Sequence, residues 1–304
     1  MKRKLALFLL FSAGLTCALC CDFLRLLDPY VAQILMYIGI NIIMTASLNL
    51  VNGYMGEFSV GHAAFMAVGA YTASFFSISV FTHGPAPVVF FPLSLFAGGG
   101  AAALVGLLIA IPAFKARDDY LAIITLALIM ITKSVFENIP WFGGPAGYSG
   151  IQKYTSLSWV FVCAAATVVV VRNLVNSNFG RGIIAVRDDE VVANLVSVDT
   201  KRVKVLAFVI SAFFAGIGGG LFAHLIQFIN PRTFSIIKST DFLLMLYLGG
   251  SGTLVGPILG AGIWTILLEL LRFLGIWRFA VAPVALIMLM IYRPRGIMGG
   301  KVRN

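Results

Sequence analysis

The chain has 304 residues, of which 60% are hydrophobic and only 11% are charged. Because a soluble domain carries about a quarter charged residues, this composition excludes an ordinary soluble enzyme. The net charge is +10, from 22 basic and 12 acidic residues. The basic residues lie in short loops between apolar runs, as is typical of the cytoplasmic side of membrane proteins, so a nucleic-acid partner is not expected.

Apolar runs of about 20 residues recur from end to end, and each is long enough to span a bilayer. They predict an all-α, polytopic membrane helix bundle with about ten transmembrane or partly re-entrant helices, in a single transmembrane domain over residues 1–304. The expected spans are 5–24, 31–51, 58–80, 86–112, 119–138, 158–175, 205–229, 240–256, 257–273 and 279–292.

Three of these spans are candidates for broken or re-entrant helices. The spans 58–80 and 240–256 are rich in Gly and Ser, and 257–273 follows its predecessor without a real loop. Such breaks occur in membranes only where the backbone is buried in protein or lines a wet cavity.

The distribution of basic residues predicts the orientation of the chain. With the N-terminus inside, 15 of the 22 basic residues fall on the inner side and 7 on the outer side. This bias predicts that both termini are cytoplasmic. The first span follows a basic start, Lys2-Arg3-Lys4, as in a signal peptide, but no small-x-small cleavage site follows, so an uncleaved first helix is expected.

Two loops are long enough to fold. The outer loop, about 139–157, is rich in Gly, aromatic and hydroxyl residues, and the inner loop, about 176–204, carries most of the loop charge. Apolar residues in the inner loop recur at helical spacing and predict a short amphipathic helix around 183–197. Asp188 and Asp189 lie just ahead of its more helical half, where acidic residues suit a helix N-terminus. An apolar face on a cytosolic loop needs a membrane or a protein partner to cover it.

Motifs for catalysis or metal binding are missing from the sequence. No phosphate-binding loop occurs, so the chain itself is not expected to bind ATP. His62, His83 and His224 have no partners at metal-ligand spacing, the four cysteines match no disulfide or zinc pattern, and no nucleophile elbow is present. An enzymatic function is therefore not expected.

Ion-coupled carriers usually have intramembrane carboxylates. Here only Glu57, Glu137, Asp241 and Glu269 lie in or near apolar spans, and Glu269 is one turn from Arg272, with which we expect it to pair. A stand-alone secondary carrier therefore stays a weaker alternative, as does a membrane subunit that transports nothing.

Glycines are frequent in two regions, and their spacing predicts close helix packing. They are Gly216, Gly218, Gly219 and Gly220 in the first region, and Gly252, Gly256 and Gly260 in the second.

Four motifs occur in one order along residues 40–292. They are Ser59-x-Gly61-His62-Ala63-Ala64-Phe65 within 48–71, the segment 119–126, the Gly-Gly-Pro-Ala-Gly segment 143–147, and the run 180–257. Together they resemble the permease subunits of ABC importers for branched-chain amino acids, specifically the larger of the two permease types.

The resemblance implies a multi-pass protein of a bacterial-type inner membrane. It implies a heterodimer with a second related permease, two cytosolic ATPase subunits that bind ATP and Mg, and an extracytoplasmic solute-binding protein, with no cofactor bound by this chain. The implied substrates are leucine, isoleucine and valine, although related permeases carry urea, short amides, other amino acids or sugars.

The resemblance also implies a coupling role for the inner loop, where Arg187, Glu190 and Ala193 occupy matching positions. With the neighbouring residues, the predicted contacts to the ATPase are Arg187, Asp188, Asp189, Glu190, Val191 and Ala193. Val192, Asn194 and Ser197 depart from the family pattern, so we expect this contact to be specific to its own partner.

Polar residues within matched apolar segments are candidates for the substrate path. They are Asn49, Asn52, Ser59, His62 and Thr125. The alternative for each is a hydrogen bond between helices.

Overall fold

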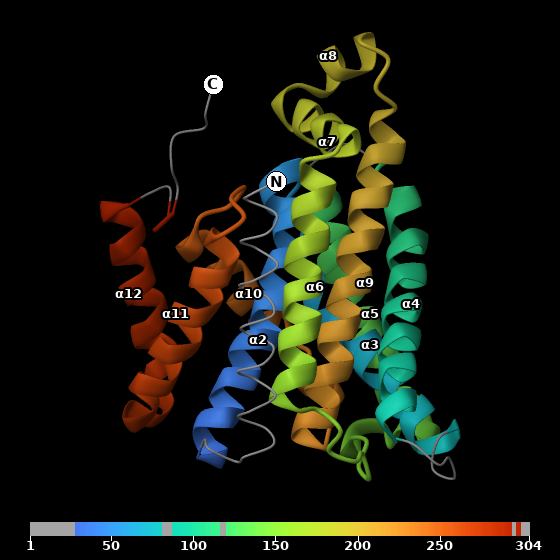
Figure 1. Ribbon diagram of the computed structural model, residues 1–304, viewed down its shortest axis with the longest axis vertical. Helices are drawn as coiled ribbons and strands as arrows, with labels where there is room; N and C mark the ends of the chain where they lie inside the picture. The colour runs from blue at the N-terminus through green and yellow to red at the C-terminus, as the bar shows by residue number, and fades with distance from the viewer. Residues whose placement is uncertain (1–27, 81–86, 116–119, 294–295, 299–304) are drawn as a thin grey trace, which may run out of the picture.

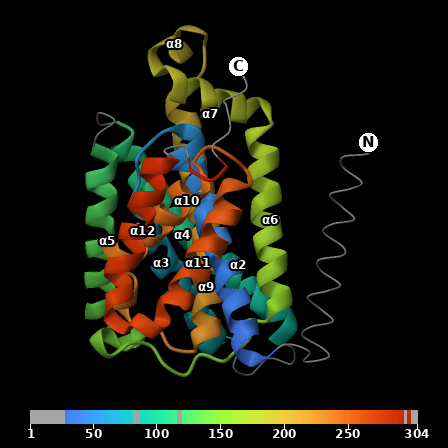
Figure 2. The ribbon, with the colours of Figure 1, turned by 90° about the vertical axis from the view of Figure 1, so that its left-hand side faces the viewer.

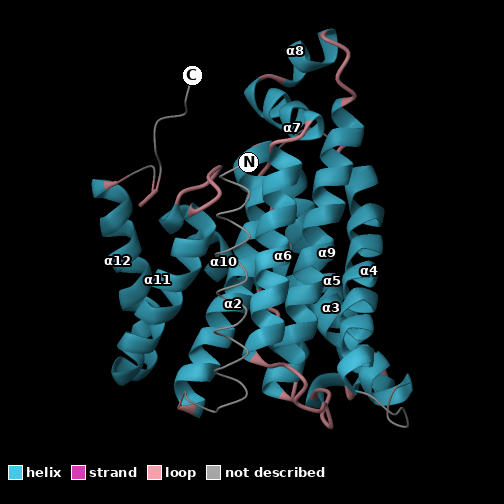
Figure 3. Cartoon of the chain, viewed as in Figure 1, coloured by secondary structure: helices cyan, strands magenta, loops and turns pink. Residues whose placement is uncertain are grey.

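The computed structural model describes residues 28–80, 87–115, 120–293 and 296–298. Within these ranges the chain is helical, with no strand beyond one isolated bridge between Tyr148 and Ile229 (Figure 3). The α-helices are α2 (Pro29–Asn49), α3 (His62–Phe75), α4 (Pro87–Ala113), α5 (Tyr120–Asn138), α6 (Leu157–Val175), α7 (Asn178–Asp188), α8 (Glu190–Leu195), α9 (Thr200–Ile226), α10 (Ile236–Gly249), α11 (Gly256–Leu270) and α12 (Arg278–Tyr292).

Shorter helical turns connect or extend these helices. The π-helical turns are η1 (Leu50–Met55) and η2 (Phe76–Val80), and the 3-10 turns are η3 (Pro140–Phe142), η4 (Gly144–Ala146), η5 (Pro231–Thr233) and η6 (Leu271–Trp277).

Six helical segments in the described part of the chain are long and apolar enough to cross a membrane. They are Pro29–Met55, Phe90–Ala113, Tyr120–Asn138, Leu157–Val175, Thr200–Ile226 and Gly256–Gly275, and each corresponds to one predicted span. The helices in the predicted spans 58–80, 240–256 and 279–292 are shorter, and the span 5–24 lies outside the described residues. The helical membrane fold is confirmed, whereas the count of ten and the cytoplasmic termini stay predictions.

The long helix α9 forms the centre of the bundle and packs against α2, α3 and α4. Glycine permits the closest approach, since a Cβ on Gly69 of α3 would lie only 2.1 Å from the carbonyl oxygen of Gly216 in α9. Similarly, a Cβ on Gly260 of α11 would lie 1.9 Å from the carbonyl oxygen of Met245 in α10. The predicted packing role is thus confirmed for Gly216 and Gly260. It is wrong for Gly252, which lies in a loop with φ +72°.

Two of the predicted broken spans are interrupted by non-helical backbone. Residues 56–61 separate η1 from α3, and in this loop only Gly56 and Phe58 are exposed. Residues 250–255 separate α10 from α11, so a real loop stands where direct continuation into 257–273 was predicted. We call these segments loop A (56–61) and loop B (250–255).

The two ends of the bundle carry different structures. In Figure 1, α7 and α8 project from one end, and the loop that contains η3 and η4 lies at the other. The quarter-turned view in Figure 2 shows the same separation. The inner and outer loops predicted from sequence therefore lie on opposite ends of the molecule.

Candidate functional site

The inner loop folds into two helices rather than the single helix predicted over 183–197. Asp189 has an extended backbone (φ −163°, ψ 111°) that separates α7 from α8. Its Oδ1 accepts hydrogen bonds from the backbone N–H groups of Val191 (2.9 Å) and Val192 (3.0 Å). The prediction was wrong because an aspartate side chain that caps a new helix competes with continuation of the old one.

The short helix α8 presents an apolar face to the outside of the molecule. The side chains of Val191 and Leu195 are 70% and 78% exposed, and Val192 and Val196 are also exposed. Ala193 is only 2% exposed and points toward the protein. Among the predicted coupling residues, Val191 is therefore available to a partner, whereas Ala193 attaches α8 to its own chain.

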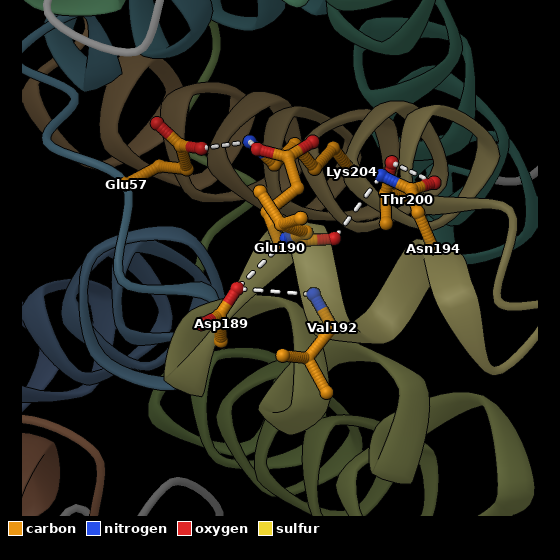
Figure 4. A network of polar contacts seen from close by, with 8 residues as sticks. Glu57, Asp189, Glu190, Val192, Asn194, Thr200 and Lys204 are labelled. Carbon is orange, nitrogen blue, oxygen red and sulfur yellow. Dashed lines mark hydrogen bonds and ion pairs between the residues drawn. The ribbon is translucent and has the colours of Figure 1, made fainter.

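A buried ion-pair network attaches α8 to the bundle (Figure 4). The Lys204 ammonium near the start of α9 lies 2.7 Å from Glu190 Oε2 and 2.5 Å from Glu57 Oε1. The side chains of Lys204 and Glu57 are 6% and 9% exposed. Because buried charges require partners, this network fixes α8 relative to loop A.

A second contact joins the end of α7 to both loops. Gly56 in loop A has φ +79°, and a Cβ there would lie 2.5 Å from Cγ of Arg187. A Cβ on Gly252 in loop B would lie 3.7 Å from Arg187 Nη1. Arg187 also pairs with Asp188 at 2.9 Å. The predicted coupling residues Arg187 and Glu190 thus both contact the bundle, Arg187 beside loops A and B and Glu190 at Lys204.

Asn49 and Asn52 hold the two loops in place. Asn49 Nδ2 donates to the Thr253 carbonyl (2.8 Å), and Asn49 Oδ1 accepts from the Gly252 N–H (2.8 Å). Asn52 Nδ2 donates to the carbonyl of Ser59 (3.1 Å), and Asn52 Oδ1 accepts from the N–H of the same residue (3.3 Å). Backbone groups lose their helical hydrogen-bond partners where a helix is interrupted, and each asparagine side chain supplies two new partners to such groups.

The other predicted path residues also make internal hydrogen bonds. Thr125 Oγ1 accepts from the Val60 N–H at 3.1 Å. His62 Nε2 lies 3.2 Å from Ser47 Oγ and 3.3 Å from Ser211 Oγ, between α2 and α9. The buried atoms Ser59 Oγ and His62 Nδ1 have no hydrogen-bond partner among the described residues. The lining role of these residues stays a prediction.

Comparison with known proteins identifies the family. Residues 30–292 match the family described as "Branched-chain amino acid transport system / permease component". The chain belongs to this family of ABC-type permeases. No solved structure gives a significant match to the permease.

Relatives of the permease carry related descriptions. It is 30% identical to the high-affinity branched-chain amino acid transport system permease protein LivM of Escherichia coli strain K12, over 85% of this chain and 68% of the relative. The probable branched-chain amino acid transport permease protein LivM of Methanocaldococcus jannaschii is 23% identical over 89% of this chain and 94% of its own length. The autoinducer 2 import system permease protein LsrC of Yersinia pseudotuberculosis serotype IB is 27% identical over 54% of this chain and 45% of its own length. All three are named as permease proteins.

Sequence reasoning missed the role of Lys204 in this permease. From the sequence, Lys204 is one of the charged residues of the predicted inner loop, about 176–204, and one of the 15 basic residues counted on the inner side. The signal that could have identified this role is Glu57, because a carboxylate this close to an apolar span requires a nearby cation. The predicted pair of Glu269 and Arg272 is confirmed at 3.0 Å.

No metal-binding cluster occurs in the described part of the permease. Within residues 28–80, 87–115, 120–293 and 296–298, no group of three His, Cys, Asp or Glu side chains lies close enough together to hold an ion.

Proposed function

We propose that the chain is the transmembrane permease subunit of an ATP-driven ABC importer in a bacterial-type inner membrane. Its partners are a second permease, two cytosolic ATPase subunits that bind ATP and Mg, and an extracytoplasmic solute-binding protein. The observation that carries the proposal is the exposed apolar face of α8, formed by Val191, Val192, Leu195 and Val196. Helix α8 lies at the end of the bundle opposite the outer loop (Figure 1).

The proposed mechanism couples ATP binding to helix movement. The apolar face of α8 docks in a cleft of an ATPase subunit, because its burial there removes apolar surface from water. When the two ATPase subunits close on ATP, the docked α8 and the adjoining α7 move with them. Helix α6 precedes α7 in the chain and α9 follows α8, so these two spans receive the movement.

The proposed substrates are leucine, isoleucine and valine. Support comes from the family description and from the LivM relatives, whose names specify branched-chain amino acid transport. The alternative is another small solute carried by the same kind of permease. This alternative is supported by a relative that is named as an autoinducer 2 import system permease. Titration of the solute-binding protein that copurifies with the chain distinguishes the two.

We further propose that Asn49, Asn52, Ser59, His62 and Thr125 provide the polar side of the translocation path. Most of their hydrogen-bonding groups are used within the chain, which leaves only weak contacts for a solute. Weak contacts suffice when a binding protein has already selected the solute. Unchanged uptake rate and selectivity in His62→Ala would remove His62 from this set.

Mass spectrometry of the proteins that copurify from native membranes in mild detergent tests the proposed assembly. We expect an ATPase and a second permease in the purified complex. A chain that is extracted alone, with uptake that follows a proton or sodium gradient, would instead identify a secondary carrier and remove the coupling role of α8.

A further inference from the structure

We propose that Lys204 is a positioning residue that transmits the movement of α8 to loop A inside the bundle. The inference rests on the proposed function, since it assumes that an ATPase moves α8. It assigns a specific mechanical link to three charged residues from separate parts of the chain, Glu57, Glu190 and Lys204 (Figure 4).

The geometry leaves the Lys204 ammonium little freedom. Its two carboxylate contacts, at 2.5 and 2.7 Å, come from opposite sides of the link, Glu57 in loop A and Glu190 in α8. The Lys204 Nζ also lies 5.9 Å from the centre of the Phe114 ring, which follows α4. Because Lys204 and Glu57 are buried, separation of their contact would weaken the pairing of two charges away from water, which is unfavourable. The three side chains are therefore expected to move together.

Glu190 is the first residue of α8, and hydrogen bonds hold it within this helix and connect the helix to the start of α9. Asn194 Nδ2 donates to the Glu190 carbonyl at 3.1 Å, and Thr200 Oγ1 donates to Asn194 Oδ1 at 3.2 Å. Asp189 caps the same helix. A displacement of the exposed face of α8 thus displaces Glu190 with it.

Loop A distributes this displacement to several helices. The Val60 N–H donates to Thr125 Oγ1 of α5, and the Val60 carbonyl accepts a hydrogen bond from Ser239 Oγ of α10. Ser59 is bound to Asn52 in η1, and α3 begins directly after the loop at His62. Glu57 therefore lies at the entry to a buried segment that contacts four helical elements.

The test uses the complete complex in proteoliposomes with its binding protein. Glu190→Ala and Glu57→Ala each break one side of the link but leave Lys204 with its other carboxylate, so the buried cation stays paired in both variants. Lys204→Arg keeps the cation, and Lys201→Ala removes an exposed cation one turn earlier on α9 as a control. The readouts are uptake, ATP hydrolysis with and without loaded binding protein, and the amount of copurified ATPase.

We expect each single carboxylate variant to reduce uptake and the stimulation of hydrolysis by binding protein about tenfold, within the range typical of coupling between sites. In Glu57→Ala, the amount of copurified ATPase and the basal hydrolysis stay at wild-type values. The triple variant Glu57→Ala/Glu190→Ala/Lys204→Met removes the buried cation together with both carboxylates, so no charge loses its partners. It is no worse than the more severe single variant, because the two contacts act in series. Lys204→Arg retains most of the coupling, and Lys201→Ala retains all of it.

Wild-type stimulation in Glu190→Ala would overturn the inference. Losses in the triple variant that multiply those of the single variants would also overturn it. Loss of copurified ATPase in Glu190→Ala would overturn it as well, because that result would assign Glu190 to the docking contact. A wild-type complex that hydrolyses ATP without importing any solute would overturn the proposed function itself, so the two failures are distinguishable.

Discussion

Asn49 and Asn52 lie three positions apart, and each side chain binds the backbone of a different interior loop. Asn49 binds residues 252 and 253 of loop B, and Asn52 binds Ser59 of loop A. One short stretch at the junction of α2 and η1 therefore fixes both interruptions of the bundle. Both loops lie beside Arg187 of the inner loop, to which we assign a coupling role in the proposed function.

Replacement of Asn49 by alanine is expected to destabilise the permease. Loss of two hydrogen bonds that leaves their backbone partners unpaired costs about 2–4 kcal/mol of unfolding free energy. Thermal unfolding in detergent measures the difference. Asn138→Ala is the matched control, because the Asn138 amide is exposed and bonds only within its own helix to the Ser134 carbonyl. Equal unfolding temperatures for the two variants would contradict the assigned role of Asn49.

Close packing of α3 on α9 predicts that Gly69→Ala is poorly tolerated. The added methyl group would lie 2.1 Å from the Gly216 carbonyl oxygen, so backbone must move, and such overpacking costs about 1–3 kcal/mol or more. Gly100→Ala in α4 meets no atom within 4 Å and serves as control. We expect Gly69→Ala to lower the unfolding temperature and the yield of monodisperse protein, with Gly100→Ala unaffected. A stable Gly69→Ala protein would mean that the helices pack less closely.

Gly56→Ala is expected to impair transport more than it impairs folding. Both Gly56 and Gly150 have positive φ, where a side chain costs about 1–2 kcal/mol. Only at Gly56 would the new Cβ also meet Arg187, whereas at Gly150 no atom lies within 4 Å. Both variants should therefore lose similar stability, but only Gly56→Ala should displace Arg187 and reduce uptake. Equal uptake in the two variants, measured with radiolabelled amino acid, would argue against a role for this contact in coupling.

Charges on the apolar face of α8 are expected to prevent assembly. Burial of a Val or Leu side chain contributes about 1.5–3 kcal/mol, so Val191→Asp with Leu195→Asp should weaken ATPase binding by about hundredfold or more. Alanine at both positions reduces the apolar area without adding charge and should give an intermediate effect. Quantitative copurification of the ATPase provides the measurement. Full recovery of ATPase with the double aspartate variant would show that α8 is not the docking surface.

The positions of the long helices follow from the sequence because burial in lipid requires uninterrupted apolar runs. The predicted span 119–138 coincides with α5 within one residue, and 158–175 coincides with α6 equally well. The helix ends at loop A and loop B were less predictable. Their local sequences are glycine-rich and mix apolar with polar residues, and the contacts that fix the loops come from Asn49 and Asn52, which lie outside them.

The site was predictable as a segment but not as a network. Arg187 and Glu190 were identified from a matching motif, whereas Lys204 resembled an ordinary basic residue at a membrane boundary. Its partner Glu57 lies far away in sequence, and periodicity carries no information on such a pairing. Asp189 illustrates the opposite limit, because a local cap interrupted a helix that apolar periodicity had predicted to continue.

Uptake of radiolabelled leucine, isoleucine and valine into proteoliposomes that contain the copurified complex tests the account most directly. With ATP supplied on the side of α8 and loaded binding protein on the other side, we predict uptake that stops when either is omitted and that persists without an ion gradient. Uptake by the permease alone, driven by a proton or sodium gradient and indifferent to ATP, would contradict the account.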